Sequence, residues 1–315
     1  MENMDNLTLL ENIKSEIGSA FVGKEELIDN ILICLLSGGH ILLEDVPGVG
    51  KTTLAKALAK VIDLSFGRIQ FTPDTLPSDI TGVSIYNMQS GRFEYREGAV
   101  MKHVLLADEI NRTSPKTQSS LLEAMAEGQV TVDGEIHTLP QPFMVIATQN
   151  PIEFLGTYPL PEAQLDRFFM KLSLGYPDKA DELKLASIFL NNMTTAELNP
   201  VCTGEDISRL QSLVKEVTIH EDIISYIINI ADNTRTNQKI SIGASPRAVL
   251  AVIRASQAYA FMQGRSFVKP DDVKRVVTPV LSHRLVMTSE AKVKKITADV
   301  IIRNIMTDLS IPVIR

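Results

Sequence analysis

The sequence predicts an α/β core, with helices on both faces of a parallel sheet, followed by an all-α domain. Three short apolar runs, at 41–43, 104–107 and 143–147, alternate with segments of helical periodicity, and unbroken runs of this kind are typical of buried parallel strands. From about residue 176 onward the periodicity is almost entirely helical. We therefore expect two domains, one at 1–175 and one at 176–315.

Each element is predicted from its local pattern: helices where apolar residues recur at helical spacing, and strands where short apolar runs lie between turn residues. In the first domain, helices are expected at 7–20, 25–36, 54–62, 76–82 and 116–127, and strands at 41–43, 67–72, 104–107, 143–147 and 171–174. Two β-hairpins, near 83–96 and 129–137, are expected as insertions, the second around an Asp-Gly turn. The helices of the second domain are expected at 178–192, 205–216, 220–234, 246–262, 270–280 and 297–309.

The composition is ordinary for a soluble globular protein, with 44% hydrophobic and 22% charged residues in a chain of 315. A net charge of −7 argues weakly against nucleic acid as the main partner. The N-terminus has no signal-peptide pattern, and the longest apolar segment, 31–36, is far too short to span a bilayer, so we expect a cytoplasmic protein. Cys34 and Cys202 lack metal-ligand spacing, which favours incidental thiols in a reducing compartment.

The first apolar run leads directly into a Pro/Gly-rich loop and then a helix, the context that a phosphate-binding loop requires. Gly48 and Gly50 allow backbone N–H groups to point inward around phosphate oxygens, and the positive end of the helix adds to this field. Lys51 can reach the β- and γ-phosphates, and the hydroxyl of Thr52 can bind Mg²⁺. Asp45 stands where the motif has its first glycine, a departure that we interpret as tolerable because that glycine serves only the start of the loop. A glycine-rich helix N-terminus that binds nothing is the alternative.

Acidic residues follow the second apolar run. Asp108, at the end of a strand beside the loop, can hold Mg²⁺ through water, and Glu109 can orient and polarise an attacking water. A solvated turn is the alternative, which the phosphate loop upstream makes less favoured. Asn150 ends the third apolar run and can place its amide near the γ-phosphate; this hypothesis rests on its position, because Asn-Pro is also a common turn.

Together these motifs resemble those of the AAA+ ATPases, and within them the MoxR family of the branch that carries a hairpin inserted in helix 2. The resemblance rests on EDVPGVGKT at 44–52 (Walker A), LADEINR at 106–112 (Walker B), ATQNP at 147–151 (sensor 1), LPEAQLDRF at 160–168 and GASPR at 243–247. These stretches lie within residues 20–285, and Asp45 also resembles a form familiar in this family. The implied fold is a P-loop NTPase core followed by an all-α lid domain.

The resemblance also implies which residues form the site. The implied cofactor-binding residues are Val22, Gly23, Pro47, Gly48, Val49, Gly50, Lys51, Thr52, Thr53 and Asp108, with Val22 and Gly23 at the adenine and Thr52 and Asp108 as Mg²⁺ ligands. The implied catalytic residues are Lys51, Glu109, Asn150, Arg167 and Arg247. Arg167 resembles an arginine finger that reaches the nucleotide of the neighbouring subunit, with an ordinary surface cation as the alternative. Arg247 resembles sensor 2, which reports from the lid whether a γ-phosphate is bound.

The implied function is Mg²⁺-dependent hydrolysis of ATP by a ring of identical subunits, expected to be a hexamer, that remodels or matures protein clients. The resemblance also suggests a partner that carries a von Willebrand factor A domain. A nucleic-acid motor is one alternative, because helicase relatives share the inserted hairpins, but the hairpin tips at 87–92 and 132–135 carry too little positive charge to favour it. A nucleotide-gated scaffold without turnover is the other, which Glu109 and Arg167 make less favoured.

Overall fold

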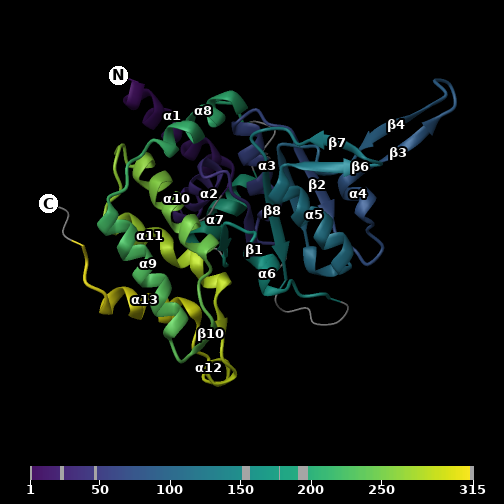
Figure 1. The fold of residues 1–315 in the computed structure, drawn as a ribbon. Coiled ribbons are helices and arrows are strands. Elements are labelled where there is room, and N and C mark those ends of the chain that lie inside the picture. The colour runs from purple at the N-terminus through teal and green to yellow at the C-terminus, as the bar shows by residue number, and fades with distance from the viewer. Residues whose placement is uncertain are drawn as a thin grey trace.

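A parallel sheet of five strands forms the centre of the first half of the chain (Figure 1). The structure is a computed structural model that describes residues 2–21, 25–45, 48–150, 157–176, 178–190 and 198–312. In the order β2–β5–β8–β1–β9, the strands are Phe66–Gln70, Val104–Asp108, Met144–Gln149, Ile41–Glu44 and Met170–Leu172, and all neighbours pair in parallel. The predicted α/β fold class is therefore confirmed.

Helices cover both faces of this sheet. Along β5, Leu106 packs into the cluster that contains α3, whereas Leu105 packs into the cluster that contains α5, because successive side chains of a strand point to opposite faces. Burial on both faces explains why these strands appear in the sequence as unbroken apolar runs. The helices of the first face are α1 (Glu2–Ala20), α2 (Glu25–Leu36) and α3 (Lys51–Val61), and those of the second are α4 (Pro77–Thr81) and α5 (Pro115–Glu127).

The second half of the chain is mainly helical. Its helices are α7 (Lys179–Leu190), α8 (Gly204–Lys215), α9 (Glu221–Thr236), α10 (Pro246–Met262), α11 (Pro270–Leu281), α12 (Ser289–Val293) and α13 (Ala298–Asp308). Helix α10 packs against α11 and α2, and the small buried side chains of Ala251 and Ala255 allow a close approach. This half also contains a two-stranded antiparallel sheet, β10 (Ile240–Ile242) with β11 (Val286–Met287), which the periodicity did not predict because its strands are so short.

Both predicted hairpins form. The first consists of β3 (Gly82–Asn87) and β4 (Arg92–Glu97) and projects far from the body of the molecule (Figure 1). The second consists of β6 (Gln129–Val132) and β7 (Glu135–Thr138), joined by Asp133 and Gly134, which both have positive φ as a tight two-residue turn requires. The projecting hairpin exposes Met88 and Phe93 to solvent, at 91% and 73%. None of the helices that the structure describes combines the length and the apolar character needed to cross a bilayer.

Two buried histidines connect elements of the core. The ring of His40 accepts a hydrogen bond from the N–H of Val145 at 3.0 Å and donates to the carbonyl of Met125 at 3.1 Å, so it links the sheet to α5. His283 lies 3.0 Å from the carbonyl of Phe168. Burial lowers the pKa of His40 to about 4, and burial together with the nearby Arg284 charge lowers the pKa of His283 to about 3.

The low pKa values predict that the protein loses stability in mild acid. In the unfolded chain both rings take up protons near pH 6.5, whereas the folded protein holds them neutral until about pH 4 or below, so stability falls as pH falls through this window. Between pH 7 and pH 5.5 we expect a loss of about 1 kcal/mol for each histidine, measured by urea unfolding. His40→Gln can make both hydrogen bonds without titrating, so its pH slope should be shallower; an unchanged slope would contradict the prediction.

Candidate nucleotide site and arginine pocket

A phosphate-binding loop follows β1. Gly48 and Gly50 have φ values of +89° and +93°, which lie in the left-handed region that glycine adopts without strain. Gly50 also lies against the ring of Phe21, where an added Cβ would be 3.3 Å from the ring. The first turn of α3 begins directly afterwards at Lys51, so its free N–H groups and its positive dipole end face the loop.

The loop forms one wall of a pocket with a volume of about 300 Å³. The residues that line it are Gly48, Gly50, Lys51, Thr52, Thr53, Arg68, Gln70, Asp108, Glu109 and Asn150. Most residues predicted to bind phosphate or Mg²⁺ are therefore brought together from three segments of the chain. Val49 belongs to the loop but is not among the lining residues, while Val22, Gly23 and Pro47 lie outside the described residues.

In the part of the chain that the structure describes, Lys51 is one of two cationic residues that line this pocket, with Arg68. Burial lowers the pKa of its ammonium group, an effect that the negative charges of Asp45, Asp108 and Glu109 oppose. Its Nζ donates a hydrogen bond to the main-chain oxygen of Asp45 at 2.8 Å. The side chain thus lies folded across the loop, close to where phosphate oxygens would be surrounded by N–H groups.

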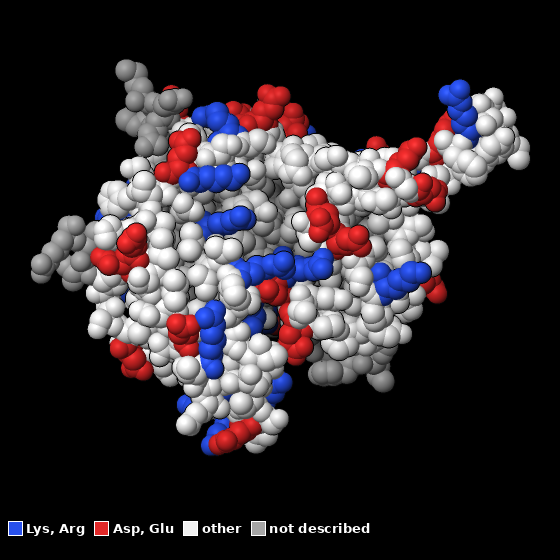
Figure 2. All heavy atoms as spheres, viewed as in Figure 1, with Lys and Arg blue, Asp and Glu red and all other residues white. Residues whose placement is uncertain are grey.

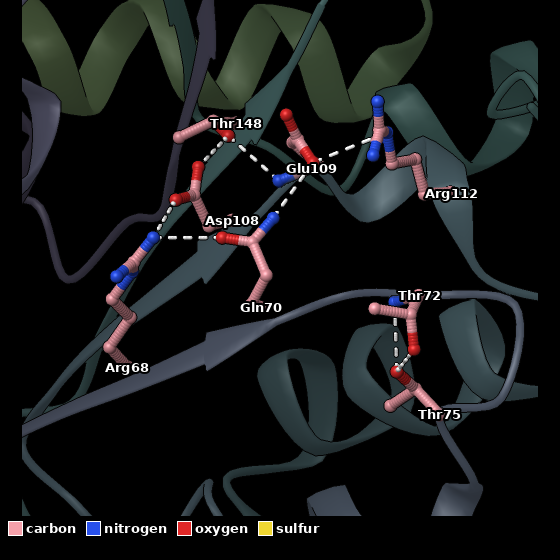
Figure 3. Close-up of polar contacts among 8 residues, drawn as sticks. All are labelled: Arg68, Gln70, Thr72, Thr75, Asp108, Glu109, Arg112 and Thr148. Carbon is pink, nitrogen blue, oxygen red and sulfur yellow. Dashed lines mark hydrogen bonds and ion pairs between the residues drawn. The ribbon is translucent and has the colours of Figure 1, made fainter. Parts of the chain in front are cut away.

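Asp108 ends β5, and two neighbouring side chains hold its carboxylate in place (Figure 3). The hydroxyl of Thr148 donates to Oδ1 at 2.6 Å, and the guanidinium of Arg68 donates to Oδ2 at 2.8 Å. Thr52 and Asp108 provide a hydroxyl and a carboxylate on the same pocket, and such hard oxygen donors suit Mg²⁺, which also keeps waters and phosphate oxygens as ligands. Among the described residues, no group of three or more His, Cys, Asp or Glu side chains could hold a metal ion.

Glu109 has a strained backbone and a fixed side chain. Its φ of +58° is uncommon for a residue other than glycine, and such conformations gather at functional sites. Its N–H donates to the Thr148 hydroxyl at 2.8 Å. One carboxylate oxygen accepts from the amide of Gln70 at 2.8 Å and lies 3.2 Å from Nε of Arg112 (Figure 3). The carboxylate is therefore held at the pocket wall by two donors.

Arg68, Gln70, Arg112 and Thr148 contact the two acidic residues but are not among the site residues predicted from the sequence. Arg68 and Gln70 alternate along β2, which places both side chains on one face of a strand, and Gln70 pairs with Asp108 in the sheet. The i, i+2 spacing of two polar residues at the end of a short strand is the only sequence signal for them. Thr148 lies within the ATQNP stretch, but the sequence alone assigned it no contact.

Arg167 and Arg247 line a second pocket, which we name the arginine pocket and which has a volume of about 350 Å³. Its charged lining residues are Asp166, Arg167, Arg247, Arg254 and Arg284. The lining thus contains four arginines and one aspartate, an imbalance that favours an anionic ligand. Figure 2 shows positively charged side chains gathered where the helical half meets the sheet half.

The two arginines reach this pocket from different parts of the chain. Arg167 follows the short helix α6 (Glu162–Leu165) and donates to the carbonyl of Leu122 at 2.6 Å. Arg247 lies in the first turn of α10, whose N-cap Ser245 also bonds to Asp166 at 3.3 Å. Arg284 is nearly buried and donates to the carbonyl of Phe168 at 2.8 Å.

The two pockets lie at opposite ends of β1. Gly38, Gly39 and His40 line the arginine pocket just before the strand begins, and Gly48 lines the phosphate pocket just after it ends. The four residues of β1 between the two pockets span roughly 13 Å, and the residues that flank the strand increase this separation. Arg167 and Arg247 therefore do not line the nucleotide pocket of their own chain.

The sequence matches two family models. The model of the ATPase family associated with various cellular activities (AAA) matches residues 40–170, and the AAA lid domain matches residues 232–305. The first match lies in the sheet half of the chain and the second in the helical half.

Relatives of known sequence and structure agree with these matches. The chain is 50% identical over 307 residues to the uncharacterized protein YeaC of Bacillus subtilis, covering 98% of this chain and 96% of that protein. It is 39% identical over 312 residues to the chaperone MoxR1 of Mycobacterium tuberculosis, covering 96% and 82%. A crystal structure of a candidate ATPase from Cytophaga hutchinsonii superposes with a TM-score of 0.93 at 40% identity, covering 98% of this chain and 97% of that one. The chain belongs to the MoxR family of AAA+ ATPases.

Proposed function

We propose that this protein hydrolyses ATP with Mg²⁺ in a ring of identical subunits and uses the cycle to remodel a protein client. The observation that carries the proposal is the separation of the two pockets. The phosphate loop and its acidic residues line one pocket, whereas the arginines expected at the same triphosphate line another at the far end of β1. A second copy of the chain is the simplest way to bring both sets to one nucleotide.

Residues of one chain would bind the triphosphate and activate the water. The loop N–H groups and Lys51 would surround the phosphate oxygens, and the amide of Asn150 would help to position the γ-phosphate. Thr52 and Asp108 would hold Mg²⁺, which when bound neutralises phosphate charge. Val22, Gly23, Pro47, Val49 and Thr53 stay predicted binding residues.

Glu109 would act as the base. A water held by its carboxylate attacks the γ-phosphorus and gives up a proton to Glu109, while the bond from that phosphorus to the bridging oxygen breaks and ADP leaves. Arg167 of the neighbouring copy would stabilise the charge that develops on the phosphoryl oxygens. Arg247 would join it from the lid and make lid position depend on the nucleotide state of the next subunit.

The choice of a protein client rests on similarity. A relative that is 39% identical is called a chaperone, which supports protein remodelling. The projecting β3–β4 hairpin offers exposed apolar side chains rather than a row of cations, which suits a protein surface better than a phosphate backbone. A partner with a von Willebrand factor A domain and a six-membered ring remain proposals from family resemblance.

Lys51→Ala provides the first test. Loss of a charged hydrogen bond to phosphate costs about 2–3 kcal/mol, so we expect affinity for an ATP analogue to fall roughly 30- to 150-fold, measured by calorimetry.

Light scattering with nucleotide should report assembly of the wild-type protein, and its ATPase rate should not rise on adding single-stranded or duplex DNA. No heat on adding nucleotide to the wild type would refute the proposed function, and strong stimulation by DNA would favour a nucleic-acid motor.

A further inference from the structure

Asp45 connects the phosphate loop, through hydrogen bonds, to residues 173–175, which follow the sheet. Its side chain is nearly buried, at 6% exposure of the residue. The carboxylate accepts hydrogen bonds from the hydroxyl of Ser173 at 2.7 Å, from the N–H of Leu174 at 2.7 Å and from the N–H of Gly175 at 3.0 Å. Three donors from three consecutive residues thus converge on one carboxylate.

The segment 173–175 follows β9, the last strand of the sheet, and leads to α7 and the helical half. The parallel pairing of β1 with β9 ends at Leu43 and Leu172. The hydrogen bonds of Asp45 therefore hold the two segments together just beyond the last pair of the ladder. Gly175 has a φ of +67°, a left-handed conformation that glycine adopts without strain, and its N–H and that of Leu174 both donate to Asp45. Two consecutive N–H groups aimed at one carboxylate form an anion-binding nest within the chain.

The same residue also contacts the ligand-binding lysine. The main-chain oxygen of Asp45 accepts the hydrogen bond from Lys51 at 2.8 Å, and Lys51 lines the phosphate pocket. The glycine that phosphate-loop motifs usually carry at this position would supply the main-chain oxygen but no carboxylate. The loop therefore does not need an aspartate here. The carboxylate adds two things, its hydrogen bonds to 173–175 and a negative charge that raises the pKa of Lys51 against the lowering effect of burial.

We propose that Asp45 couples occupancy of the phosphate pocket to the segment 173–175 and, through it, to the helical half of the chain. This inference rests on the proposed function, because the coupling begins when nucleotide binds. The ammonium group of Lys51 then exchanges its hydrogen bond to the main-chain oxygen of Asp45 for one to a phosphate oxygen. Loss of that contact frees one side of Asp45 while its other side still holds the exit segment. Nucleotide therefore shifts the position and exposure of 173–175, since binding changes a population only where the states interact with it differently.

Hydrogen exchange of the peptide amides at 174–176 tests the coupling. In the wild type we expect exchange there to change on saturation with Mg²⁺ and a non-hydrolysable ATP analogue. In Asp45→Gly the same amides should exchange about 10-fold faster without nucleotide and should no longer respond to it. Each variant is compared at nucleotide concentrations that saturate it, so a difference in affinity does not affect the comparison.

Glu44→Gln is the matched control. Glu44 pairs with Lys171 at 2.7 Å across the same two strands, so this variant weakens the β1–β9 connection but leaves the Asp45 contacts in place. Its amides at 174–176 should still respond to nucleotide. A merely structural role for Asp45 would raise exchange in Asp45→Gly but leave the nucleotide response intact, and that outcome would overturn the inference.

Two further variants keep the test decisive. Ser173→Ala removes one donor and should reduce the response only partly, and Asp45→Asn, which keeps one acceptor oxygen, replaces Asp45→Gly if the glycine variant does not fold. Failure of the wild type to bind nucleotide would refute the proposed function itself. Binding by the wild type without any change at 174–176 would refute only the coupling.

Discussion

Replacing Arg167 with alanine should lower kcat for ATP hydrolysis about 10³-fold or more while leaving ATP bound. The guanidinium is expected to offset charge on the transferring phosphoryl group through two parallel hydrogen bonds, which alanine cannot make. Arg167→Lys should recover only part of the rate, because an ammonium is a point charge without the planar fork. The measurement is steady-state ATPase activity at saturating ATP.

Mixing two inactive variants tests whether Arg167 acts on a neighbouring copy. Arg167→Ala keeps its own phosphate pocket, and Glu109→Gln keeps its own arginine, so their shared interface can contain one intact site. Random mixing in equal amounts should restore about a quarter of the interfaces. A mixture as inactive as its two components would argue that Arg167 does not complete the site of a neighbour.

Replacing Glu109 with glutamine should lower kcat about 10²- to 10⁴-fold, the usual range for a general base, and should spare nucleotide binding. The amide oxygen can still accept from Gln70, which now donates to the carboxylate at 2.8 Å, so the local structure should persist. What is lost is the ability to take the proton of the attacking water. Calorimetry and ATPase assays on the same preparation separate binding from turnover.

Glu205→Gln on the exposed surface of α8 is the control for a general change of charge, and its turnover should match that of the wild type. Normal turnover in Glu109→Gln would show that Glu109 is not the general base. Weak binding together with slow turnover would instead indicate that the carboxylate helps to shape the pocket.

The sequence predicted the elements that local patterns specify. The strands that carry the phosphate loop and Asp108 were predicted because burial on both faces leaves an unbroken apolar run. The meeting of Lys51 with Asp108 and Glu109 was predictable because the carboxyl ends of parallel strands share one edge of the sheet. The roles of these residues, and the division of the chain at 175 and 176, stay predictions.

Other features depend on pairings that a local pattern does not contain. Arg68 and Gln70 reach the acidic residues only because β2 lies beside β5, a neighbour far along the sequence. The place of Arg247 depends on how α10 packs against α2 and on the bond from Ser245 to Asp166. Asp45 was interpreted as merely tolerated, whereas its carboxylate has three partners more than 120 positions away along the chain.

In the proposed ring, the placement of the two pockets at either end of β1 would give each copy a donor side and an acceptor side. Assembly in the proposed ring is consequently head-to-tail, and an open chain of copies always leaves one unfinished site at its end. Closure of the ring would complete that last site. The total ATPase rate should therefore rise more steeply than protein concentration. In that ring each copy would supply arginines to one neighbour and receive them from the other, so every interface would have the same polarity.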